Sequence, residues 1–129
     1  RDRVREILES DAPPEDKMRQ TVENHLMRFE TRFAESKITL RDDYFAENEV
    51  VLAEMQPIWD EYEKLWIAII QEGQDKGVFD TTLDPRLAHL GILGLCNWVA
   101  RWYKPGSSTP VPELIAMYNR MVLRSLQAD

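Results

Sequence analysis

The segment Gly94–Gly106, GLCNWVARWYKPG, holds the side chains best suited to binding chemistry. Asn97 and Arg101 are four residues apart on a predicted helix, which places both on one line in otherwise apolar surroundings. A buried polar group needs a hydrogen-bond partner. That partner is either another side chain or the carbonyl or phosphate of a bound molecule, which the planar guanidinium of arginine suits well. We therefore treat both residues as candidate ligand contacts.

The same helix carries two glycines and two tryptophans that allow a structural or a functional interpretation. Gly91 and Gly94 are three residues apart, and each costs about 1 kcal/mol of helix propensity relative to alanine. Such a cost indicates that something approaches the helix closely, either a partner helix or a ligand. Trp98 and Trp102 follow on the same face, where tryptophan more often anchors a core or an interface than stacks on a ligand.

The residue sets that usually carry catalysis are missing from the sequence. There is no Gly-rich phosphate loop, no Cys/His ligand cluster and no G-x-S-x-G motif. Neither His25 nor His89 has a glutamate three residues before it, as a helical metal-carboxylate site would need. We predict no enzyme activity, no metal and no cofactor. His89 is expected in or beside an interface, and His25 at the edge of an apolar helix face.

Composition narrows the class of protein. The 129 residues fit one domain, and the net charge of −7 leaves no basic patch for nucleic acid, so this chain should not bind DNA by itself. A single cysteine, Cys96, cannot form an internal disulfide and predicts a reducing, cytoplasmic location. The uncharged run 87–100 is shorter than the roughly 20 apolar residues that span a bilayer, so it predicts a buried helix and no membrane association. The start, RDRVREILES, lacks a methionine and predicts that an upstream segment has been removed.

Apolar residues recur every three or four positions along most of the chain, which predicts an all-α fold. The predicted helices cover 4–8, 15–35, about 51–76, 85–104 and 110–126. Within the third, Pro57 predicts either that the helix begins near Gln56 or that it is kinked there. Residues 36–48 are expected to form a connector.

The last two predicted helices have more apolar surface than one small domain can bury. The helix over 85–104 is apolar on both faces, and the final helix has a wide apolar stripe with Met117 and Leu123 beside it. Two-fold symmetry would pair them as a four-helix homodimer interface. The predicted interface residues are Gly91, Gly94, Leu95, Trp98, Trp102, Leu114, Tyr118, Met121 and Val122.

Three motifs give the chain a family resemblance. They are Q-E-G-x-x-x-G-V-F at 71–79, D-P-R-L-A at 84–88 and G-x-x-N-W-x-x-R-W-Y-K-P-G at 94–106. With the closing amphipathic helix, they resemble the C-terminal regulatory domain of TetR-family transcriptional regulators, particularly the branch that senses acyl-CoA thioesters. The resemblance implies about six helices, the last two forming a homodimer and the middle ones enclosing a ligand pocket. It also implies an N-terminal DNA-binding helix-turn-helix, which this chain lacks.

The function that the resemblance implies is effector sensing and dimerisation in a repressor of lipid or sterol catabolism. A ligand would favour one arrangement of the two subunits and so change the spacing of the DNA-reading heads. Asn97 and Arg101 would meet the thioester or a phosphate. A helical dimerisation module with a solid core, and a small helical enzyme, remain the alternatives. The predicted pocket residues, which ordinary core packing would also explain, are Met18, Val22, Leu26, Phe29, Tyr62, Trp66 and Ile69.

Overall fold

The structure is a computed structural model that describes residues 2–31, 49–104 and 108–128, with the side chains of 28–31, 49–52 and 100 excepted. The predicted connector at 36–48 lies outside the described residues. Within the described ranges the chain is helical, without a strand, which confirms the all-α prediction. The helices are α1 (Asp2–Glu9), α2 (Pro14–Thr31), α5 (Glu49–Asp75), α6 (Pro85–Asn97), α7 (Val99–Trp102) and α8 (Val111–Leu126).

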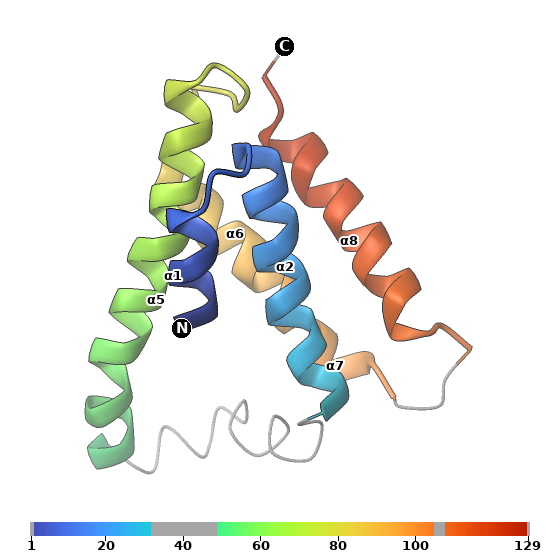
Figure 1. The fold of residues 1–129 in the computed structure, drawn as a ribbon. Helices are drawn as coiled ribbons and strands as arrows, with labels where there is room; N and C mark the ends of the chain where they lie inside the picture. Colours follow the sequence, from blue (N-terminus) through green and yellow to red (C-terminus); the bar gives the residue numbers. More distant parts are fainter. Residues whose placement is uncertain (1, 32–48, 105–107, 129) are drawn as a thin grey trace.

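Helix α2 lies at the centre of the domain (Figure 1), where it contacts α1, α5, α6 and α8. Met18, Val22 and Leu26 follow one another at four-residue intervals along α2 and are all buried. Trp66 and Ile69 of α5 are buried in the same core. The 3.6-residue periodicity read from the sequence therefore identifies the interior face of these two helices correctly. No helix in the described ranges is long and apolar enough to cross a membrane.

A buried lysine joins the first three described helices. The Lys17 ammonium donates to the carbonyl oxygen of Leu8 at 2.7 Å and to the Glu72 carboxylate at 2.8 Å. Leu8 lies in the last turn of α1, where carbonyl groups lack intrahelical partners. The Lys17 side chain thus supplies a hydrogen-bond donor to a carbonyl at the end of α1 and links α1 to α2 and α5.

Helix α5 contains Pro57 in its interior. The alternative in which the helix begins near Gln56 is therefore wrong, because α5 already starts at Glu49. Proline removes the hydrogen bond to the carbonyl four residues earlier, that of Ala53. Ala53 and Pro57 are both exposed, so water can solvate the freed carbonyl. At the other end, Gly77 takes a φ of 77°, the left-handed conformation that glycine commonly adopts just after a helix.

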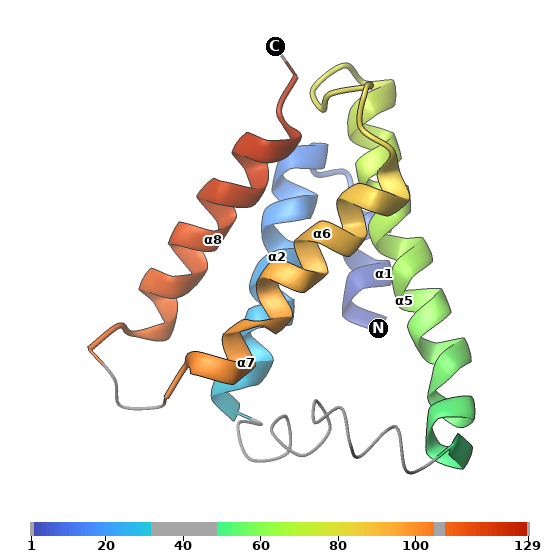
Figure 2. The same ribbon diagram turned by 180° about the vertical axis from the view of Figure 1, so that it is seen from behind.

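The helix predicted over 85–104 is divided at Trp98 into α6 and α7 (Figure 2). Its predicted start is confirmed, because the Asp84 carboxylate accepts hydrogen bonds from the amides of Arg86 and Leu87 at 2.9 and 3.2 Å. At the division, the Arg101 amide bonds the Trp98 carbonyl only three residues back, at 2.9 Å. This tighter spacing is that of a 3₁₀ turn.

The end of the chain is fastened to the link between α5 and α6. The Asp80 amide donates to the Leu126 carbonyl at 2.7 Å, and the Ala128 amide donates to the Val78 carbonyl at 3.0 Å. These bonds flank an isolated antiparallel bridge between Phe79 and Gln127. The Phe79 ring is thereby held in the core over Gly73.

Candidate functional site

A hydrogen-bonded chain of side chains joins three helices inside the domain. His25 of α2 lies between Tyr62 of α5 and Asn97 of α6, with Nδ1 2.9 Å from the Tyr62 hydroxyl and Nε2 2.7 Å from the Asn97 Oδ1. An amide oxygen can only accept a hydrogen bond, so a neutral His25 ring must carry its proton on Nε2 and donate it to the Asn97 oxygen. Its unprotonated Nδ1 then accepts a hydrogen bond from the Tyr62 hydroxyl. The arrangement brings together two of the predicted ligand residues, Tyr62 and Asn97. His25, which the sequence indicated only as a structural residue, connects them.

Trp66 and His89 complete this group. The Trp66 ring lies 6.0 Å from the rings of both His25 and Tyr62, and 5.5 Å from that of His89. Both side chains are fully buried. The indole Nε1 and both imidazole nitrogens of His89 have no hydrogen-bond partner among the described residues. We call His25, Tyr62, Trp66, His89 and Asn97 the polar-aromatic cluster.

His89 is fully buried in the core of the single chain, on α6, the helix that carries much of the predicted interface. Burial lowers the pKa of His89 below its usual 6.5; the nearby Glu63 carboxylate acts in the opposite direction, and the Arg86 guanidinium adds to the lowering. The ring is therefore neutral at pH 7. A neutral imidazole presents one N–H donor and one acceptor.

The lowered pKa of His89 predicts a loss of stability in mild acid. The unfolded chain takes up a proton near pH 6.5 and the folded chain only at lower pH, so stability should fall as pH decreases below 6.5. Replacing His89 by leucine should flatten this part of the profile. Urea unfolding at pH 7.5 and pH 5.5 measures the difference for both proteins. Equal pH dependence in the variant and the parent would contradict the assignment to His89.

The other predicted ligand residues fall into three groups. Met18, Val22, Leu26 and Ile69 are buried in the core beside the cluster. Phe29 belongs to α2, but its side chain lies outside the described residues. Arg101 is exposed, with its guanidinium carbon 5.6 Å from the centre of the Trp98 ring, while Asn97 points to His25. The two predicted polar contacts therefore differ in their surroundings, since Asn97 is half-buried against His25 whereas Arg101 is exposed.

The predicted interface residues separate into an exposed set and a buried set. Leu114 and Val122 are 5% and 1% exposed within the single chain, so they belong to its own core and have no surface left for a partner. Leu95 and Tyr118 are half-buried. The exposed set comprises Gly91, Gly94, Trp98, Trp102 and Met121. Three further exposed apolar residues that were not predicted, Leu87, Leu90 and Met117, lie on the same helices, and we call the eight residues together the α6–α8 face.

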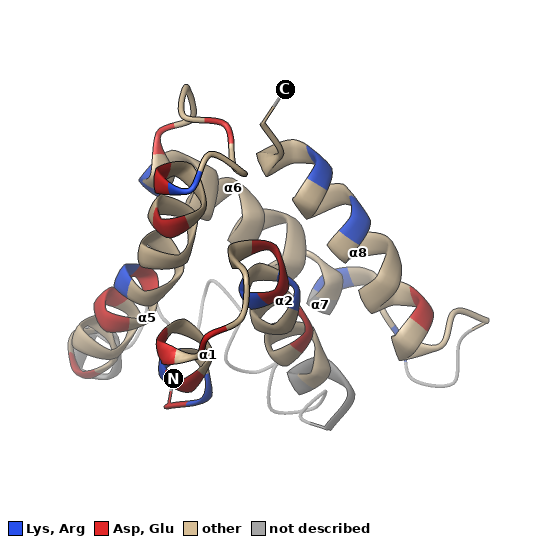
Figure 3. Ribbon diagram, turned by 45° about the horizontal axis from the view of Figure 1, so that its top comes forward, with Lys and Arg blue, Asp and Glu red and all other residues tan. Residues whose placement is uncertain are grey.

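The α6–α8 face lies on helices that carry few charges. Figure 3 shows α6 almost free of coloured positions, since Arg86 is its one charged residue, whereas acidic residues recur along α5 with one lysine, Lys64, among them. In Figure 2 no described helix covers α6 and α7 on the side turned to the viewer. A large apolar surface of this kind marks an interaction site.

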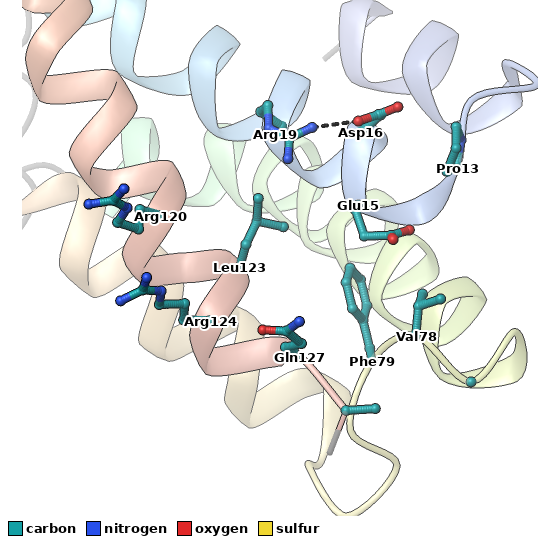
Figure 4. Close-up of a pocket in the computed structure, with 12 residues that line it drawn as sticks. Pro13, Glu15, Asp16, Arg19, Val78, Phe79, Arg120, Leu123, Arg124 and Gln127 are labelled. Carbon is teal, nitrogen blue, oxygen red and sulfur yellow. Dashed lines mark hydrogen bonds and ion pairs between the residues drawn. The ribbon is translucent and has the colours of Figure 1, made fainter.

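A separate groove lies where α2 begins and α8 ends (Figure 4). It has a volume of about 620 Å³, and its walls include Glu15, Phe79, Arg120 and Arg124. None of the predicted ligand or interface residues lines it. Its charges have both signs, and Arg19 in its wall pairs with Asp16. In the described ranges, no group of three or more His, Cys, Asp or Glu residues is placed to hold a metal ion.

The fold defined by these helices is that of the regulatory part of a bacterial transcription factor. Residues 11–126 match the family described as "Tetracyclin repressor-like, C-terminal domain", and the chain belongs to this family. A stretch of 67 residues, 51% of the chain, is 36% identical to the HTH-type transcriptional repressor KstR2 of Rhodococcus jostii (strain RHA1). That stretch covers 32% of the repressor. The family resemblance predicted from the three motifs is thus confirmed.

Two solved structures show the same fold. The ketosteroid transcriptional regulator KstR2 of Mycobacterium tuberculosis superposes with a TM-score of 0.87 at 20% identity, over 98% of this chain and 65% of that chain. A TetR/AcrR-family regulator from Thermobifida fusca YX-ER1 superposes with a TM-score of 0.78 at 20% identity, over 95% of this chain and 63% of that one. The chain therefore spans less than two thirds of each of these two regulators.

Proposed function

We propose that this chain is the effector-sensing and dimerisation domain of a TetR-like transcriptional repressor. Its effector would be a hydrophobic small molecule, an acyl-CoA thioester of lipid or sterol catabolism, and it would control DNA binding by a helix-turn-helix that precedes the domain. The polar-aromatic cluster is the observation that carries the sensing function. It joins side chains of α2, α5 and α6 by hydrogen bonds, and it contains buried nitrogens of Trp66 and His89 that have no partner among the described residues, which a ligand would satisfy.

The cluster is also placed to transmit binding. A ligand that engages His25 or Asn97 acts on the contacts between α2 and both α5 and α6. Lys17 ties the last turn of α1 to α2 and α5, so a shift of α5 reaches the first helix of the domain. The effector must bind two arrangements of these helices unequally in order to change DNA binding.

The acyl-CoA class rests on the apolar residues around the cluster and on the relatives. Met18, Val22 and Leu26 form an apolar row that leads along α2 towards His25, which suits an acyl or sterol body. Asn97 would meet the thioester, and the exposed Arg101 would meet a phosphate of coenzyme A. One relative of similar fold is described as a ketosteroid transcriptional regulator, which supports the lipid or sterol class.

A thermal-shift panel tests the proposed function. The domain is heated with octanoyl-CoA, palmitoyl-CoA, 5β-cholanoyl-CoA, the three free acids and coenzyme A alone. A ligand that binds only the folded state at a hundredfold excess over Kd adds about 2.7 kcal/mol of stability, which raises the midpoint by several degrees. We expect at least one thioester to stabilise the domain while coenzyme A does not. An unchanged midpoint with every compound would remove the acyl-CoA assignment.

The dimerisation function rests on the α6–α8 face. A Cβ atom added at Gly91 or Gly94 would meet nothing within 4 Å in the single chain, so packing inside this chain does not explain either glycine. In the proposed dimer, a helix of the second copy approaches the backbone at these two positions, between Trp98 and Leu87.

Alanine at Gly91 and Gly94 should therefore act in opposite directions on the monomer and the dimer. In the isolated chain, each substitution should add about 0.5–1 kcal/mol through helix propensity. In the dimer, the two added methyl groups should weaken association by about tenfold or more, since overpacking a tight contact costs about 1–3 kcal/mol. Sedimentation equilibrium measures the dimer, and urea unfolding at low concentration measures the monomer. Unchanged association would place the interface elsewhere.

A helical dimerisation module with a solid core is the alternative. It is favoured by the complete burial of Met18, Val22, Leu26 and Ile69, which pack in the core of the free chain. The same thermal-shift panel separates the two functions, because a solid core gives no stabilisation by any thioester while the dimer persists.

A further inference from the structure

Trp66 and His89 form a pair of buried polar side chains that the packing of the chain does not satisfy. The indole Nε1 and both imidazole nitrogens lack a hydrogen-bond partner among the described residues, and both side chains are inaccessible to solvent. Burying such atoms unpaired costs free energy, and three of them occur in two side chains whose rings are 5.5 Å apart. The neighbouring His25 is satisfied by Tyr62 and Asn97, so it does not relieve them.

The donor and acceptor types define what would satisfy this pair. The indole N–H only donates, and a neutral imidazole donates from one nitrogen and accepts at the other. The ring centres of Trp66 and His89 lie 5.5 Å apart, so a single ligand group placed beside both rings would be near the nitrogens of both side chains. The complementary group is therefore a carbonyl or hydroxyl oxygen. A carboxylate or phosphate would bring a charge that no cation in the cluster balances.

We propose that Trp66 and His89 recognise an uncharged oxygen on the apolar body of the effector, that of a ketone or hydroxyl group, by hydrogen bonding to it. This inference rests on the proposed function and adds to it a second point of recognition, separate from the thioester contact assigned to Asn97. The pair lies on α5 and α6, so a single ligand oxygen would connect these two helices directly. Effectors with and without that oxygen would then differ in affinity although their apolar bodies are the same.

The test compares 5β-cholanoyl-CoA with its 3-oxo, 7-oxo and 12-oxo derivatives, which differ only in the presence and position of one ketone. Isothermal titration into the domain should show one oxo derivative binding about tenfold more tightly than the parent thioester, as expected for two added hydrogen bonds. Trp66→Phe and His89→Leu should each reduce this ratio to about twofold or less, because each removes one partner while conserving an apolar side chain of similar size.

Two controls separate recognition from folding. Phe79→Leu changes a residue that is also buried but lies in the link after α5, and it should lower stability while leaving the ratio between oxo and parent thioesters unchanged. His89→Leu should leave the thermal midpoint of the free domain at pH 7.5 equal or higher, since it removes unpaired buried atoms. A purely structural His89 would instead show a lowered midpoint, which would count against the proposal.

The remaining outcomes show whether the recognition of an oxygen by Trp66 and His89 fails alone or together with the proposed sterol thioester class. If the thioesters bind but no oxo derivative gains affinity, or if the gain survives in both variants, the pair holds only a structural water and the inference is wrong while the sensor function stands. If none of the cholanoyl thioesters binds, including the unsubstituted one, the sterol thioester class fails and this inference fails with it.

Discussion

Alanine at position 73 is expected to lower the free energy of unfolding by about 3 kcal/mol, which is within the range measured when a buried phenylalanine is lost from a core. The reason is Phe79, because the added Cβ would lie 2.0 Å from Cδ2 and 2.5 Å from Cγ of its ring. The ring is 1% exposed and is fixed by the bridge to Gln127, so it cannot move aside without leaving the core. Urea unfolding followed by circular dichroism measures the loss.

Gly77→Ala is the matched control for this substitution. Gly77 is four residues along the chain, its added Cβ would meet nothing within 4 Å, and its cost is the backbone strain of a positive φ, about 1–2 kcal/mol. In a Phe79→Ala background, Gly73→Ala should lower the free energy of unfolding little further, because the ring with which the added Cβ would clash is already absent. Equal losses of stability from Gly73→Ala and Gly77→Ala would show that a clash with the Phe79 ring is not the reason for glycine at position 73. Additive losses from Gly73→Ala and Phe79→Ala would show the same.

Lys17→Met is expected to destabilise the domain by about 2–4 kcal/mol. The side chain of Lys17 is 3% exposed, and its removal leaves the Glu72 carboxylate, itself 26% exposed, without its partner at 2.8 Å. Breaking a buried ion pair from one side costs more than the pair contributes, because the remaining charge stays partly desolvated. The Leu8 carbonyl at the end of α1 loses its donor as well. Thermal and urea unfolding measure the cost.

Lys76→Met is the control for Lys17, because Lys76 approaches the same Glu72 oxygen. Its ammonium lies 3.9 Å away and its side chain is 57% exposed, so its removal should change stability by less than about 0.5 kcal/mol. Hydrogen exchange gives a second measurement, since α1 should lose protection in the Lys17 variant and keep it in the Lys76 variant. Similar effects of the two substitutions would refute the role given to burial.

Local signals in the sequence predicted most of the helices correctly. The Asp84 cap, the glycine after α5 and the apolar periodicity of α2 depend on residues within one or two turns of each other. The division at Trp98 has no such signal, because no proline, glycine or capping side chain stands there. It became apparent only from the hydrogen bond between the Arg101 amide and the Trp98 carbonyl.

The candidate site was predictable only in part, for a related reason. Tyr62 and Asn97 were identified from helical faces, but His25 joins them across 37 and 72 residues of sequence, and no local pattern contains that information. Likewise, one side of the wide apolar stripe on the last helix packs in the core of the chain, and the other side is exposed to solvent. The stripe alone does not show that Val122 belongs to the first and Met121 to the second.

Isothermal titration of 5β-cholanoyl-CoA measures whether a small apolar effector binds at the polar-aromatic cluster. We predict one molecule bound per protomer, and an affinity at least about tenfold lower in Asn97→Leu, which breaks the contact with His25. Asn119→Leu, a buried amide on α8, should bind as the parent does. No saturable heat beyond that of coenzyme A, or equal affinity in Asn97→Leu and the parent, would contradict binding at the cluster.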